Sequence, residues 1–268
     1  MKPVSFDDLE NCIAECDPAL KCAAVDELKA RTDSAGFKLD HSHEAREFPQ
    51  PGRPLKPELV APAQLKRRRL GSRAGRGALV HAVAHIEFNA INLALDAAYR
   101  FRGLPAAFYS DWLNVAWDEA RHFRWLSDRL EQLGLSYGDL PAHNGLWEMA
   151  LRTAHSGLVR MALVPRVLEA RGLDVTPGMI GRLSAAGDQQ TVAILRNILV
   201  EEVRHVEVGS RWFEWFCGQQ GMAPEATFMQ LLDEYYGGRI KGPINRQARL
   251  QAGFKESELC ALTETAQT

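Results

Sequence analysis

The sequence lacks both a strong net charge and a long hydrophobic run. Its 268 residues contain 32 Lys and Arg against 34 Asp and Glu, so there is no overall field to attract nucleic acid or an anionic membrane. No stretch approaches ~18 uninterrupted apolar residues, and acids occupy the N-terminal positions where a secretory signal has its apolar core. We therefore expect a cytoplasmic protein that does not associate with a membrane, and any contact with nucleic acid would have to come from a local patch.

The sequence also lacks paired cysteines. Its five cysteines are odd in number and contain no C-x-x-C pair: Cys12, Cys16, Cys22, Cys217 and Cys260. A chain of this length needs no disulfides to fold, so a reducing compartment fits best. The first three cysteines could form part of a metal cluster, but no fourth ligand follows nearby. Their spacing favours packing on helix faces.

Strand-like alternation with hairpin turns is missing throughout, so we expect no β-sheet. Ser5 and Asp8 predict the start of a first helix that continues to about Arg31. Five prolines in residues 48–62 predict an extended strap, since proline blocks a helix and favours an extended predecessor. The basic stretch in residues 66–76 has no interleaved aromatics, which favours a solvated helix end over an RNA contact.

Apolar residues at helical spacing predict four long helices from residue 78 onward. Their expected bounds are Ala78–Phe101, Pro105–Leu133, Leu146–Arg171 and Asp188–Phe216. Gly134 is expected to end the second helix and Gly172 the third. Pro165 is expected to kink or widen the third helix. Thr176 and Pro177 are expected to form the N-cap and first turn of the segment that leads into the fourth helix. A shorter helix is expected at Pro224–Tyr236.

These features predict an all-α protein with three parts. Residues 1–76 form an N-terminal helix, a strap and a basic segment, residues 77–220 form a helical metal-binding domain, and residues 221–268 form a C-terminal helical extension. The long helices carry the residues with the clearest chemical potential.

Two Glu-x-x-His pairs occur on the apolar faces of the second and fourth long helices. Glu119 and His122 form one pair, and Glu202 and His205 form the other. A separation of three residues places both side chains of a pair on one helix face. Exposed charge pairing with neighbouring arginines is the simpler interpretation of each pair taken alone.

The other two long helices each place one glutamate among apolar residues, Glu87 and Glu169. The spacing is nearly duplicated: Glu87 precedes Glu119 by 32 residues and Glu169 precedes Glu202 by 33. Isolated ionised carboxylates are costly in a helix core. The sequence therefore predicts a repeated helix pair whose carboxylates converge.

Four carboxylates and two imidazoles match the ligands of the di-iron and di-manganese carboxylate four-helix bundles. Two divalent cations would neutralise the four negative charges and make their burial favourable. Mixed oxygen and nitrogen ligation with open positions favours iron or manganese over a structural zinc site.

Several segments together resemble a group of bacterial ferritin-like proteins built on a domain of unknown function. They are HAVAHIEFNAINLALD, DEARHF, VLEARGLD, EEVRHVE, PGRPLKPELVAP and KRRRLGSRAGR. The resemblance extends from about Pro49 to Tyr236. It implies a ferritin-like four-helix fold and a dinuclear metal site at Glu87, Glu119, His122, Glu169, Glu202 and His205. VLEARGL and the paired motif are also distantly similar to the ferritin-like tRNA hydroxylase, whose minimal bundle has neither the N-terminal helix nor the strap.

Some positions have alternatives. Glu201 lies four residues before His205 and could replace Glu202, although Glu202 fits the repeat better. His81 and His85 are rival ligands near Glu87, but we expect them to support the site or lie at the surface. Asp118 and Glu201 are possible carboxylate partners for the imidazoles.

The first functional hypothesis is an oxygen-activating enzyme with two iron ions, or alternatively manganese or a mixed Mn/Fe pair. It would use dioxygen or peroxide to oxidise an unidentified small molecule by hydroxylation or a related two-electron oxidation, with electrons from an unknown donor. By analogy, Glu119 and Glu202 bridge the metals. A second hypothesis is a ferroxidase or peroxide-handling metal protein without an organic substrate, and a third is a non-catalytic binding protein. The oligomeric state is not defined by the sequence.

Overall fold

Helices make up 70% of the computed structural model, and its described residues contain no β-strand. The structure describes residues 1–39, 44–66, 68–237, 240 and 242–264. Packing divides the chain into two units. Unit 1 is Met1–Leu151 with Ala186–Ile194, and unit 2 is Arg152–Ala185 with Leu195–Thr268. These two units are defined by contacts between residues. The three parts predicted from the sequence are defined by composition, and they stay a prediction.

The N-terminal region forms two helices, α1 (Phe6–Ala14) and α2 (Pro18–Ala35). Ser5 caps α1 in a capping box, as its sequence predicts. The prediction of a single helix to about residue 31 is wrong. Pro18 has no amide to continue α1, and the Asp17 side chain instead accepts hydrogen bonds from the first free amides of α2.

The strap contains no α-helix within residues 44–61, as its prolines predict, and ends in the short 3₁₀ helix η1 (Pro62–Gln64). It is anchored to the rest of unit 1 by backbone and side-chain hydrogen bonds. Trp147 Nε1 donates to the Phe48 carbonyl at 3.2 Å, and Leu59 forms an isolated β-bridge with Ala142.

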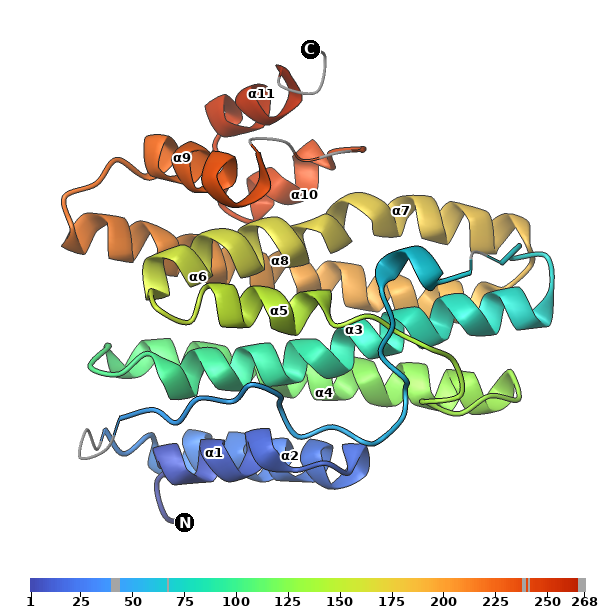
Figure 1. The fold of residues 1–268 in the computed structure, drawn as a ribbon, viewed down its shortest axis with the longest axis horizontal. Helices are drawn as coiled ribbons and strands as arrows, with labels where there is room; N and C mark the ends of the chain where they lie inside the picture. The colour runs from blue at the N-terminus through green and yellow to red at the C-terminus, as the bar shows by residue number, and fades with distance from the viewer. Residues whose placement is uncertain (40–43, 67, 238–239, 241, 265–268) are drawn as a thin grey trace. The chain divides into compact units, whose positions relative to one another are not determined.

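Unit 1 is built around the long helices α3 (Arg73–Arg100) and α4 (Ala106–Gln132), which pack extensively against each other (Figure 1). A five-residue connection joins them, so they run antiparallel. Helix α3 begins before the predicted Ala78 because Ser72 caps it by accepting from the Gly75 amide. Helix α4 ends before Gly134, whose φ of 76° is the left-handed conformation expected there.

Helix α3 is long and apolar enough to cross a membrane by length and composition alone. Of its most hydrophobic 18-residue window, 78% is buried inside the protein. A core helix of a soluble protein shows the same properties, so this helix is weak evidence for a membrane span.

The third predicted helix is divided into several elements. They are α5 (Gly145–Arg152), α6 (Gly157–Leu163), the π-helical turn η2 (Val164–Glu169) and α7 (Ala170–Ala185). The wider turn at Pro165 confirms the predicted distortion, since proline cannot donate the usual backbone hydrogen bond.

The prediction that this helix ends at Gly172 and that Thr176-Pro177 begins another is wrong. Helix α7 continues through both positions to Ala185. Pro177 leaves the carbonyl of Leu173 without its usual helical donor. The side-chain amide of Asn245 donates to that carbonyl at 3.1 Å, so a residue distant in sequence compensates for the proline.

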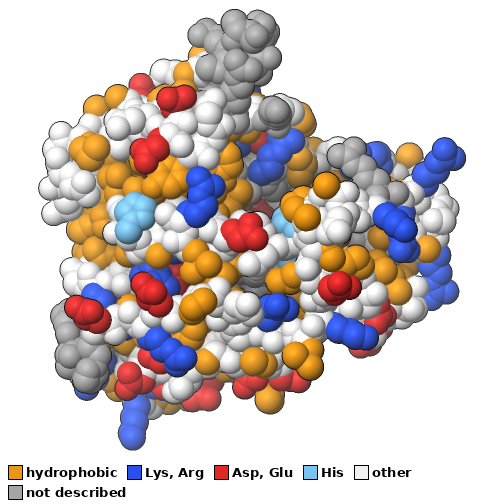
Figure 2. Space-filling view, in the orientation of Figure 1, with side chains coloured by type: hydrophobic (Ala, Val, Ile, Leu, Met, Phe, Trp, Pro, Cys, Tyr) orange, Lys and Arg blue, Asp and Glu red, His pale blue; other side chains and the backbone are white. Residues whose placement is uncertain are grey.

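Helix α8 (Gln189–Gln219) extends the predicted fourth helix by a few residues. Helix α9 (Pro224–Tyr236) has the predicted bounds. The C-terminal extension adds α10 (Arg246–Gln251) and α11 (Glu256–Glu264). Figure 2 shows acidic and basic side chains interspersed over one face, as the balanced composition predicts.

Buried ion pairs connect the C-terminal extension to the rest of unit 2. Arg249 Nη2 lies 2.7 Å from Asp174 Oδ2, and both side chains are fully buried. Arg166, on the π-helical turn, pairs with Glu258 and lies over the rings of Phe213, Phe228 and Phe254. The extension is therefore an integral part of unit 2.

Candidate metal centre

Three predicted ligands meet between α3 and α4 in unit 1. His122 Nδ1 lies 3.1 Å from Glu87 Oε2 and 3.4 Å from Glu119 Oε2. One ligand atom from each of the three residues lies within 4.8 Å of the others. The exposed fraction is 4% or less for each residue, so the group is enclosed by protein.

The helical sequence explains this convergence. Glu119 and His122 share one face of α4, as their spacing predicts, and that face packs on α3. Phe88 and Phe123 follow Glu87 and His122 directly and contact each other, with ring centroids 5.3 Å apart. This aromatic contact aligns the two antiparallel helices so that Glu87 lies beside His122.

The charge of this group requires compensation. Two carboxylates approach a single imidazole nitrogen, and buried negative charge is expensive unless it is paired with a cation. A neutral imidazole that donates one N–H does not balance two carboxylates. A divalent cation held by two carboxylate oxygens and one imidazole nitrogen fits this donor set.

The nearby acid Asp118 forms an ion pair with an arginine of the same helix. Its Oδ1 accepts a hydrogen bond from Arg121 Nη2 at 2.8 Å, one turn along the same helix. The Arg121 guanidinium also lies over the rings of Trp117 and Trp125. Asp118 thus orients an arginine of its own helix.

His81 and His85 lie outside the ligand group. Both are buried, so of the two expected roles, support of the site or a surface position, the surface position is wrong. His81 Nε2 accepts from the Gly138 amide at 3.0 Å, and His85 bonds to Tyr137 Oη at 2.9 Å and to the His143 carbonyl at 3.1 Å. Burial lowers the pKa of both imidazoles, that of His85 to about 4, so both are neutral at pH 7.

The other three predicted ligands belong to unit 2. His205 is fully buried, and its Nδ1 lies 3.5 Å from Glu202 Oε1 on the same face of α8. Glu201 and Glu202 are both intermediate in exposure, so burial alone does not distinguish them. Glu169 is half-buried and is the last residue of the π-helical turn.

A close approach between η2 and α8 sets the register within unit 2. A methyl group added at Gly209 would lie 2.2 Å from the Cβ of Pro165, so the helices meet there almost backbone to backbone. Helices α7 and α8 are joined by three residues and run antiparallel (Figure 1). One turn away from this contact, in the same direction, lie Glu169 and His205. Glu169 and His205 therefore lie at the same height along the axes of their two helices, as Glu87 and His122 do in unit 1.

Sequence patterns did not identify the buried Lys21. Its ammonium group donates to the Ile13 carbonyl at 3.0 Å and to the Asn92 side chain, and its exposed fraction is zero. Burial lowers the pKa of Lys21 to about 8. The only sequence signal was a lysine among apolar positions of a helix, which is common on surfaces because the lysine stem is apolar.

Comparison with known proteins identifies the family of this chain. An uncharacterized protein of Haemophilus influenzae is 47% identical over 222 residues, which cover 80% of this chain and 77% of the relative. No solved structure matches the chain. The pattern of one family, described as a protein of unknown function (DUF455), matches residues 14–260. The chain therefore belongs to the DUF455 family.

Proposed function

We propose that this protein is a dinuclear iron or manganese carboxylate oxidoreductase of ferritin-like fold. The observation that carries the proposal is the enclosed group of Glu87, Glu119 and His122 in unit 1. Two buried carboxylates beside one imidazole are the ligands of one metal ion and half of the set used by such bundles.

The second half of the proposed site comes from unit 2. Glu169, Glu202 and His205 repeat the residue types and the spacing of the first set. Within unit 2, the single glutamate and the histidine also lie at the same height along their helices, as they do in unit 1. We propose that these residues complete the dinuclear site. The assignment of these three residues rests on the duplicated pattern: of the six proposed ligands, each unit supplies one glutamate from one helix and a Glu-x-x-His pair from another.

The protein side chains have distinct tasks in this proposal. Each imidazole would supply a nitrogen donor, Glu87 and Glu169 would each supply a carboxylate to one cation, and Glu119 and Glu202 would by analogy supply the carboxylates shared by both cations. The metal ions, when bound, would supply the electrons and open coordination positions that activate dioxygen. The near-complete burial of Glu87, Glu119 and His122 keeps bulk water away from the ligand group.

Metal content tests the proposal directly. We expect two ions of iron or manganese per chain, measured by elemental analysis after anaerobic purification and metal loading. Glu119→Gln and Glu202→Gln should each reduce the bound metal to one ion or fewer, because each removes a bridging carboxylate. Matched variants Glu131→Gln, exposed on α4, and Glu201→Gln, next to Glu202, should keep both ions.

Three results would contradict this site. If Glu201→Gln lost metal and Glu202→Gln retained it, Glu201 would be the ligand in place of Glu202. Equal metal content in all four variants would show that metal binds elsewhere. If the wild type bound one ion per chain, and Glu119→Gln lost this ion while Glu202→Gln kept it, the site would be restricted to unit 1.

Iron oxidation distinguishes the oxidoreductase from a ferroxidase. When the reduced protein meets air, the oxidoreductase should oxidise only its two bound irons, whereas a ferroxidase continues with added ferrous iron. Rapid oxidation of many iron equivalents per chain would favour metal handling without an organic substrate.

A further inference from the structure

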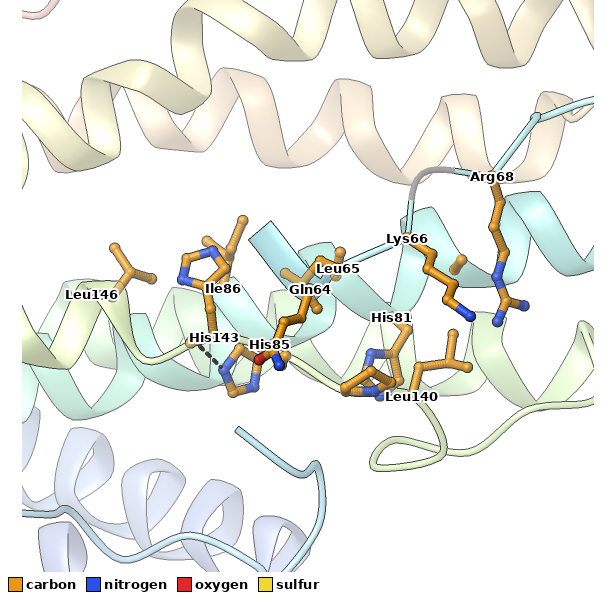
Figure 3. Close-up of a pocket in the computed structure, with 14 residues that line it drawn as sticks. Gln64, Leu65, Lys66, Arg68, His81, His85, Ile86, Leu140, His143 and Leu146 are labelled. Atoms are coloured by element: carbon orange, nitrogen blue, oxygen red, sulfur yellow. Dashed lines mark hydrogen bonds between the residues drawn. The ribbon is translucent and has the colours of Figure 1, made fainter. Parts of the chain in front are cut away.

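A pocket of about 380 Å³ lies beside α3 and is lined only by residues of unit 1. Its walls come from one face of α3, the end of the strap and residues 140–146, as Figure 3 shows. Its volume is within the ~300–1,000 Å³ range of small-molecule sites. None of the six proposed metal ligands lines it.

One end of this pocket is basic. Lys66 and Arg68 both line it and are exposed, and neither makes a hydrogen bond or ion pair within the described part of the chain. No aspartate or glutamate is among the lining residues. Two cations without a neighbouring acid attract an anionic group and can bind it through charge-assisted hydrogen bonds.

The other end is apolar. Ile86 and Leu146 lie there, away from Lys66 and Arg68 (Figure 3). Ile86 is 45% exposed, whereas most residues of α3 are buried. An apolar group that covered Ile86 would gain about 25 cal/mol for each Å² removed from water.

The histidines of the pocket form a fixed polar wall between its ends. His81 and His85 already bond to protein groups, as described above. His143 Nδ1 accepts from the Gly145 amide at 3.2 Å, which leaves the N–H at Nε2 as a donor. The wall therefore offers one hydrogen-bond donor, His143 Nε2–H, to a ligand.

We propose that this pocket binds a small organic anion with an apolar body. The acidic group contacts Lys66 and Arg68, and the apolar body covers Ile86 and Leu146. Residues two apart on a helix point about 200° apart, so His85 faces the pocket while Glu87 faces His122 on α4. The inference therefore does not depend on metal binding.

Two fluorescent probes with the same ring system test this proposal on the full-length protein. The anionic probe is 8-anilinonaphthalene-1-sulfonate, and the neutral probe is N-phenyl-1-naphthylamine. We expect Arg68→Gln to weaken binding of the anionic probe about five- to tenfold, as for loss of one partly exposed charged contact. Binding of the neutral probe should change less than about twofold, because its rings meet only the apolar end.

Arg69→Gln is the matched control, since Arg69 is adjacent, exposed and outside the pocket. It should leave both affinities unchanged. Ala82→Trp, at an exposed position of α3 that lines the pocket, should abolish binding of both probes by filling the space. Thermal unfolding of each variant shows that the fold is retained.

Equal weakening by Arg68→Gln and Arg69→Gln would overturn the proposal, because it would indicate a general charge effect. Unchanged binding of both probes to a folded Ala82→Trp variant would also overturn it, because the probes would then bind elsewhere.

Discussion

Glu119 has opposite effects on stability with and without metal in the proposed site. In the presence of metal its carboxylate stabilises the folded state by holding cations. Without metal it adds a second buried negative charge beside Glu87, which repels it and raises the cost of burial.

We expect Glu119→Ala to lower the free energy of unfolding of the metal-loaded protein by about 3 kcal/mol, the gain from a ligand at ~100 times its dissociation constant. In metal-free protein the loss should be smaller or reversed in sign. Thermal unfolding with iron and with a chelator gives the two values. Equal destabilisation in both states would identify Glu119 as a purely structural residue.

The buried Lys21 predicts a pH dependence of stability on the alkaline side. Its pKa is about 8 in the folded protein and 10.5 in its ordinary state. Below pH 8 the ammonium is protonated in both states and stability does not change with pH. Between pH 8 and 10.5 the unfolded chain holds the proton that the folded chain loses, so stability rises with pH.

A Lys21→Met variant isolates this effect, because the buried thiols of Cys12 and Cys22 titrate in both proteins. The difference in unfolding free energy between wild type and variant should move in favour of the wild type by about 3 kcal/mol between pH 8 and 10.5, at about 1.4 kcal/mol per pKa unit. Urea unfolding at several pH values measures it. A constant difference would show that Lys21 keeps its ordinary pKa.

The contact between η2 and α8 depends on the absence of a side chain at Gly209. An added methyl group would overlap the rigid ring of Pro165 at 2.2 Å. We expect Gly209→Ala to destabilise the protein by about 1–3 kcal/mol through overpacking. Gly218→Ala on the same helix meets nothing within 4 Å, so it should be neutral or stabilising by up to about 1 kcal/mol. Urea unfolding compares them, and similar effects would contradict the proposed close approach.

At the level of elements, local sequence signals predicted the helices well where one interaction determines an end. Ser5, Gly134 and Pro224 mark ends that the structure confirms. The signals failed where a distant residue changes the outcome. Thr176-Pro177 looks like a helix start, but Asn245, about 70 residues away, supports the helix through the proline. No local pattern contains that information.

The candidate site shows the same division at the level of the molecule. Helical periodicity predicted that Glu119 and His122 share a face, and the structure places Glu87 beside them. The duplicated spacing predicted the second set but could not give its burial, which depends on packing around the π-helical turn. The pocket beside α3 joins residues from three separate segments, so no single sequence motif describes it.

The path of the chain through the two units also constrains its synthesis. Unit 1 contains Ala186–Ile194 in addition to its first 151 residues, so the chain enters unit 2 before unit 1 is complete. Arg129 of α4 makes hydrogen bonds to Asp188 and Thr191 in this late segment. On the ribosome, the N-terminal helices emerge long before these partners do. Unit 1 is therefore completed only after the start of α8 has emerged from the ribosome, and Glu169 of unit 2, which precedes that segment in the chain, emerges before it.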